Sequence, residues 1–104
     1  MKSMGDVAGH PLLAERIRLQ LMVAIAAEET VDFVDLLERL QLTKGNLSSH
    51  LRKLEDAGLI EVEKGFVERK SRTSYCCTEI GRKALGAHLD ELETLILTLK
   101  NRAS

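Results

Sequence analysis

Apolar residues along this chain follow two different spacings, and the changes between them divide it into secondary-structure elements. In four segments the apolar positions lie three or four residues apart, which is typical of helices with one buried face. In residues 59–64 apolar and polar residues alternate, which predicts a strand, and residues 73–78 are predicted to form a second strand. The predicted helices are residues 11–27, 32–40, 43–57 and 79–101, and the predicted strands are residues 59–64 and 73–78.

Residues that favour helix ends stand at the borders of these segments. Pro11 suits the first position of a helix, and Gly58 suits the position that follows the end of one. Val31 predicts a short strand or an extended entry to the second helix. Good N-cap residues precede the later helices: Asp32, Thr43 and Thr78.

The chain has 104 residues, of which 44% are hydrophobic, and this is enough for one domain with a core. We expect a single domain over residues 1–104, with a loose N-terminus at residues 1–9. The element order, helix, helix, helix, strand, hairpin loop, strand, helix, predicts a mainly α fold with a small β-hairpin, an α+β domain.

The third predicted helix has two unlike faces. Leu47, Leu51 and Leu54 form one apolar stripe, whereas the opposite face is small or polar and its only charges are positive. A helix that enters the major groove of DNA needs such a face and an anchored rear. The predicted DNA contacts on this helix are Lys44, Asn46, Ser48, Ser49, Arg52 and Lys53.

Within that set the chemistry predicts different roles. The fork of Arg52 fits the O6 and N7 atoms of guanine, and Lys44, at the helix start, fits a phosphate. The alternative is that Arg52 and Lys53 are ordinary solvated charges. Gly45 permits close approach to DNA or is simply tolerated in the first turn. We expect His50, at the border of the core, to be packed and hydrogen-bonded.

Positive charge gathers a second time in the segment that joins the two predicted strands. The chain has a net charge of −1, but residues 64–83 hold six Lys or Arg and two Asp or Glu, a net +4. We predict that residues 65–72 form a basic hairpin loop in which Arg69, Lys70 and Arg72 contact phosphates. The alternative is that these charges only keep the hairpin tip soluble.

The last predicted helix carries an apolar stripe longer than a small domain covers. Leu85, Leu92 and Leu99 repeat every seven residues, and Leu89 and Ile96 do the same. Such a stripe most simply meets a second copy of itself.

Two blocks of sequence resemble the winged helix-turn-helix transcriptional regulators of the MarR/ArsR type. The first block is residues 42–58, with the pattern Leu-Thr-x-Gly-Asn-Leu-Ser-x-His-Leu-x-Lys-Leu-Glu-x-x-Gly. The second block contains Thr73, Tyr75, Thr78, Gly81, Arg82 and Ala84. Over residues 12–99 the chain is most similar to the small stand-alone members of this type.

This resemblance implies a homodimeric repressor or activator that binds double-stranded DNA at a pseudo-palindromic operator. The third helix would enter the major groove, and the hairpin, the wing, would touch phosphates or the minor groove. The first and last helices, 11–27 and 79–101, would build the dimer. The implied dimer interface is Leu13, Ile17, Leu85, Leu89, Leu92, Ile96 and Leu99.

Other classes of function find little support in the sequence. No phosphate loop, metalloprotease motif or hydrolase motif is present, so we expect no enzyme and no cofactor. The chain has no cysteine before position 76, and His88 and Asp90 lie two residues apart, so the family's known metal sites do not fit. Without a membrane span or a signal peptide, we expect no membrane partner and a cytoplasmic location.

Two further hypotheses stay open. The first is a winged-helix module that binds other proteins. The second is a switch that responds to oxidants through Cys76 and Cys77, or to a ligand in a cavity at the dimer interface. The sequence does not identify the operator, the direction of regulation or a small-molecule effector.

Overall fold

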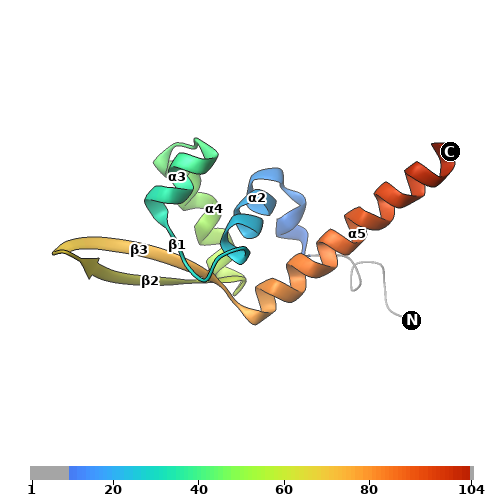
Figure 1. Cartoon of the computed structure of the whole chain (residues 1–104). Helices are drawn as coiled ribbons and strands as arrows, with labels where there is room; N and C mark the ends of the chain where they lie inside the picture. The colour runs from blue at the N-terminus through green and yellow to red at the C-terminus, as the bar shows by residue number, and fades with distance from the viewer. Residues whose placement is uncertain (1–9, 104) are drawn as a thin grey trace.

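The computed structural model describes residues 10–103, and its elements follow the predicted winged helix-turn-helix order (Figure 1). The predicted loose N-terminus, residues 1–9, lies outside the described residues. The elements are η1 (Pro11–Ala14), α2 (Arg16–Ala26), β1 (Val31–Asp32), α3 (Phe33–Leu40), α4 (Lys44–Asp56), β2 (Ile60–Val67), β3 (Lys70–Cys77) and α5 (Glu79–Ala103).

The first predicted helix is two elements, which corrects the single span of residues 11–27. Pro11 begins a short 3-10 helix, η1, and His10 caps it by accepting a hydrogen bond from the Leu12 N–H. Glu15 then adopts an extended backbone, and its carboxylate accepts from the Arg18 N–H at 2.8 Å. Glu15 therefore ends η1 and is the N-cap of α2.

Helices α2, α3 and α4 and the base of the sheet enclose one apolar core. Its members are almost fully inaccessible, and burial of each large aliphatic side chain stabilises the fold by roughly 1.5–3 kcal/mol. The core includes Leu21, Met22, Ile25, Val31, Leu36, Leu47, Leu51, Leu54, Leu59, Ile60 and Tyr75.

The sheet is antiparallel with the strand order β1-β3-β2. Its β2-β3 hairpin is longer than the sequence predicted, because residues 65–72 are not a loop. Only Glu68 and Arg69 lie between the strands, and both have positive φ, at 51° and 69°, as in a type I′ turn. Beyond Val62 both faces of β2 are solvent-exposed, so no hydrophobic alternation marks the strand there.

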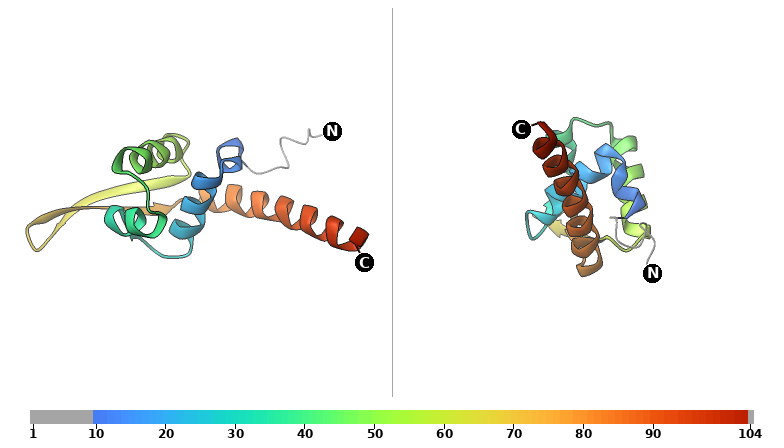
Figure 2. Two further views of the ribbon diagram at one scale, coloured as in Figure 1. Left: turned by 90° about the horizontal axis from the view of Figure 1, so that it is seen from above. Right: turned by 90° about the vertical axis from the view of Figure 1, so that its right-hand side faces the viewer.

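Helix α5 and the hairpin leave the helical body in opposite directions (Figures 1 and 2). The Thr78 hydroxyl caps α5 by accepting from the Gly81 N–H at 2.9 Å, and it donates to the Gly58 carbonyl at 2.6 Å. A Cβ on Gly81 would lie 2.0 Å from the Leu59 carbonyl oxygen, so only glycine fits where α5 crosses the chain. Among residues 10–103, no helix has the length and apolar character that a membrane span needs.

Candidate nucleic-acid interface

Helix α4 is fixed from behind by its apolar stripe, as the sequence predicted. Leu47, Leu51 and Leu54 are each at most 2% exposed. The Thr43 hydroxyl accepts from the Asn46 N–H at 3.1 Å, and Gly58 has the positive φ of 77° that follows a helix end. Both predicted boundary residues are confirmed, and the position of α4 is set by the core.

The outer face of α4 is open to solvent. Within residues 10–103, no side chain forms a hydrogen bond or ion pair with the cationic and hydroxyl groups of this face. The surface holds no carboxylate before Glu55, so nothing on it repels a phosphate. The exposed residues are Lys44, Gly45, Asn46, Ser48, Ser49, Arg52 and Lys53, and we call them the α4 surface.

A polar contact supports α4 at the edge of its buried face. His50 is half-buried, and its Nδ1 lies 3.3 Å from Arg18 Nη1. Because a guanidinium can only donate, Nδ1 accepts. The predicted packed, hydrogen-bonded histidine is confirmed. Its partner Arg18, which also donates to the Leu12 carbonyl at 2.8 Å, had no signal in the sequence.

Glu15 completes this contact from the start of α2. Its carboxylate lies 4.0 Å from His50 Nδ1. The hydrogen bond from the Arg18 N–H lowers the pKa of the Glu15 carboxyl, and the nearby Arg18 charge lowers it further, although burial partly opposes this shift. The N-cap of α2 therefore favours the ionised carboxylate.

The three predicted cations of the wing are not equivalent. Arg69, in the turn, and Lys70, at the start of β3, are exposed without a partner among the described residues. Arg72 instead donates to the Asp32 carboxylate at 2.6 Å. Asp32 precedes α3 as predicted, but its side chain makes no cap hydrogen bond. The Arg72–Asp32 pair ties the wing to the body of the domain.

The predicted dimer residues also separate into two groups. Leu13 and Leu85 are 0% and 7% exposed within the protomer, and Ile17 packs half-buried against the core. Leu13 and Leu85 already fill the protomer's own core, and the dimer interface itself stays a prediction. The stripe that stays accessible runs along the second half of α5: Leu89, Leu92, Ile96 and Leu99, with Leu95 beside it.

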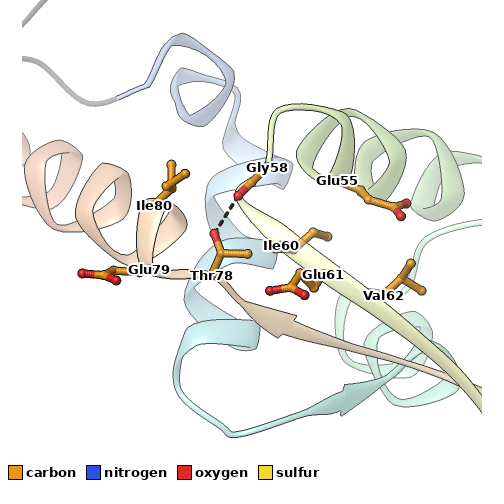
Figure 3. A pocket seen from close by; sticks show the side chains of 8 residues that line it. All are labelled: Glu55, Gly58, Ile60, Glu61, Val62, Thr78, Glu79 and Ile80. Carbon is orange, nitrogen blue, oxygen red and sulfur yellow. Dashed lines mark hydrogen bonds between the residues drawn. The ribbon is translucent and has the colours of Figure 1, made fainter.

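An open pocket of about 660 Å³ lies where α4, β2 and α5 meet (Figure 3). Glu55, Glu61 and Glu79 line it beside Val62 and Ile80. Three carboxylates would repel DNA phosphates, so this pocket does not extend the α4 surface.

The two cysteines are both half-buried and lie on opposite faces of the sheet. Cys77 pairs with Ile60 and packs against the core, whereas Cys76 pairs with the exposed Glu61. Burial raises the pKa of the Cys77 thiol, and the nearby Arg82 charge only partly offsets this. Its thiol also donates weakly to the Thr78 carbonyl at 3.4 Å. Cys77 therefore lacks the stabilised thiolate that an oxidant sensor needs.

The profile of the winged helix DNA-binding domain matches residues 17–96, and the chain belongs to this family. The family and the fold are those of transcriptional regulators and not of enzymes. The resemblance predicted from the sequence is confirmed.

Individual relatives agree with this assignment. An uncharacterised protein of Methanocaldococcus jannaschii is 33% identical over 76 residues, which is 73% of this chain and 83% of the relative. A transcriptional regulator homologue from Pyrococcus horikoshii has a TM-score of 0.79 at 32% identity, over 85% of this chain and 87% of the other.

More distant structures share the fold. The S. aureus MepR–DNA complex has a TM-score of 0.72 at 20% identity and covers 88% of this chain and 78% of the other. A MarR-family regulator from Porphyromonas gingivalis has a TM-score of 0.67 at 22% identity, over 83% and 82% of the two chains.

Proposed function

We propose that this protein is a homodimeric transcriptional regulator that binds a specific DNA sequence. The α4 surface carries the proposal, because its cationic and hydroxyl side chains are unpaired while the rear of the helix is buried. These groups match the donors and acceptors of base edges and phosphates. The MepR–DNA complex, which has the same fold, supports DNA as the partner.

Each part of the interface has a distinct role in this proposal. Arg52 contacts a guanine edge in the major groove, with Asn46, Ser48 and Ser49 beside it. Lys44 and Lys53 contact phosphates. The wing lies on the adjacent DNA backbone and minor groove, where Arg69 and Lys70 neutralise phosphates. Arg72 stays paired with Asp32.

A second copy of the chain covers the apolar stripe of α5. Leu89, Ile96 and Leu99 are 42%, 52% and 70% exposed, and several apolar side chains this exposed on one helix are typical of an unfilled interface. A two-fold dimer would place its two α4 surfaces about 34 Å apart, one turn of DNA. The bound site would then be a pseudo-palindrome.

Selection of bound sequences from a random duplex pool tests this function directly. We expect an enriched motif with two inverted half-sites whose centres lie about 10 base pairs apart. The matched variant is Arg69→Ala, which should weaken all sequences alike and reduce the slope of log affinity against log salt by about one. If the pool yields no motif and the chain does not bind random DNA at low salt, the proposal is wrong and a protein-interaction module becomes the better hypothesis.

A further inference from the structure

The wing carries an apolar side chain that the proposed phosphate contacts do not explain. Phe66 is 78% exposed, more than any other large hydrophobic residue in the described chain, and Val67 beside it is 47% exposed. Phe66 pairs with Ser71 across the hairpin, and this small partner covers little of the ring. Full burial of a phenylalanine side chain is favourable by roughly 1.5–3 kcal/mol, so a partner that covers the ring would bind more tightly because of it.

The register of the hairpin fixes the direction in which Phe66 projects. Alternate residues of a strand point to the same face, so Phe66 shares a face with Ile60 and Val62. Ile60 and Val62 pack on the core beside Tyr75, which places this face on the side of the helices. Phe66 therefore projects from the same side of the sheet as α4, near the far end of the hairpin.

The charges around Phe66 identify the partner as a polyanion. Residues 64–72 contain four Lys or Arg and one Glu. Lys64 shares the face of Phe66, Arg69 lies in the turn and Lys70 lies on the opposite face, so cations surround the ring. Glu68, also in the turn, partly offsets them. Cations that flank an exposed ring match a groove bordered by two rows of phosphates better than an apolar protein surface.

From this geometry we infer that Phe66 is a wedge that inserts between base pairs in the minor groove and bends the DNA; the inference rests on the proposed DNA-binding function. A hairpin whose strands lie about 4.8 Å apart does not fit deep in a minor groove about 6 Å wide. Insertion of an apolar side chain unstacks one base step, kinks the duplex and widens this groove. Lys64, Arg69 and Lys70 then reach the flanking phosphates.

The wedge adds a kind of sequence preference that α4 does not provide. Pyrimidine–purine steps such as TA and CA unstack at the lowest energetic cost. We expect the selected motif to contain such a step outside the α4 half-site, at the position the wing reaches. The preference there depends on the ease of kinking and involves no hydrogen bond to a base.

A bending assay with the selected duplex tests the wedge. Fluorophores at the two DNA ends should report a bend of about 20–90° with the unmodified protein. Phe66→Ala should abolish most of the bend and weaken binding about 5- to 150-fold, the range for loss of an aromatic–base contact. Phe66→Leu, which keeps an apolar wedge, should retain most of the bend.

Val67→Ala is the matched control, because Val67 is the exposed neighbour on the other face of the hairpin, and it should leave the bend unchanged. Equal bending and affinity for Phe66→Ala and the unmodified protein would overturn the wedge and leave DNA binding intact. A change in the oligomeric state of DNA-free Phe66→Ala would also overturn it, by showing that the ring docks on a second copy. Failure of the unmodified protein to bind DNA would instead overturn the proposed function.

Discussion

Helix α4 and the wing both present cations to solvent, but they are held by different means. Three fully buried leucines and two defined end residues fix α4. The hairpin beyond Val62 buries no side chain and relies on its ladder of backbone hydrogen bonds and on the Arg72–Asp32 pair. Helix α4 is therefore part of the core, whereas the β2-β3 hairpin projects from the domain and is attached only at its base.

This difference suits two kinds of DNA recognition. Hydrogen bonds to base edges need side chains held at fixed positions, since misplacement of a donor removes the discrimination between bases. Phosphate contacts and groove insertion tolerate, and even require, an element that moves with the duplex. Preference that is read through hydrogen bonds to base edges should accordingly depend on the anchoring of α4, and salt dependence and preference for an easily kinked step should depend on the wing.

The largest expected effect comes from removing the anchor of α4. Leu51→Ala deletes buried methyl groups and should lower the free energy of unfolding by about 2–5 kcal/mol, as measured by urea denaturation. Val34→Ala is the control on α3, where the side chain is 63% exposed, and it should change stability by less than about 0.5 kcal/mol. Equal effects of the two substitutions would show that α4 is not anchored by its stripe.

Loss of Arg52, the side chain proposed to contact a base, ranks next. Arg52→Ala should cost about 1–3 kcal/mol of binding free energy on the selected motif and relax preference at one base position. Titration against a set of single-base variants of the motif measures both quantities.

Lys53→Ala, the neighbouring cation on the α4 surface, is the control and should weaken all variants alike. Uniform weakening by Arg52→Ala as well would show that its role is a phosphate contact and not base recognition.

The elements that the sequence predicted well are those whose signals are local. The limits of α4 follow from Thr43, Gly58 and the leucine stripe, all of which lie within or beside the helix. The α4 surface followed from the same periodicity, because residues opposite a buried stripe must face solvent. The short strand at Val31 and the half-buried His50 were predicted on similar grounds.

The features that the sequence did not predict depend on which residues lie near each other in the folded chain and on which faces the core covers. The hairpin beyond Val62 has no buried face, so its strands show no alternation of hydrophobic residues. The Arg72–Asp32 pair joins positions 40 apart, and it forms because Asp32 pairs with Ser74 and Arg72 lies diagonally to it. Spacing alone also did not show that the protomer's core reaches Leu85 and ends before Leu89.

A smaller effect is expected where the wing joins the body. Arg72→Ala and Asp32→Ala should each lower the free energy of unfolding by about 1 kcal/mol or less, because both side chains are partly exposed. A double-mutant cycle should give a coupling of about 0.2–1 kcal/mol. Hydrogen exchange should speed up at the amides of residues 70–73 in both variants. Zero coupling with unchanged exchange would contradict the role of this pair as the attachment of the wing.

The smallest effect tests whether polar contacts behind α4 add to its leucine anchor. The pKa of the Glu15 carboxyl is lower in the folded state than in the unfolded chain. The stabilisation that the Glu15 charge provides is therefore fully present above the unfolded-state pKa of about 4.3, and it is lost as the pH falls through the folded-state pKa. Glu15→Gln keeps the acceptor for the Arg18 N–H but removes the charge, so it should be about 0.3–1 kcal/mol less stable at pH 7.

That difference between Glu15→Gln and the unmodified protein should shrink progressively when urea denaturation is repeated at pH values below about 4.3, because the Glu15 carboxyl then becomes protonated. Glu79→Gln is the matched control, since Glu79 is exposed in the first turn of α5 and pairs with Lys83 of its own helix. If the Glu15→Gln difference persists unchanged at low pH, the carboxylate charge does not support α2 beside His50. In that case the buried leucines alone would fix α4, and the difference between α4, held by the core, and the wing, attached only at its base, would be larger.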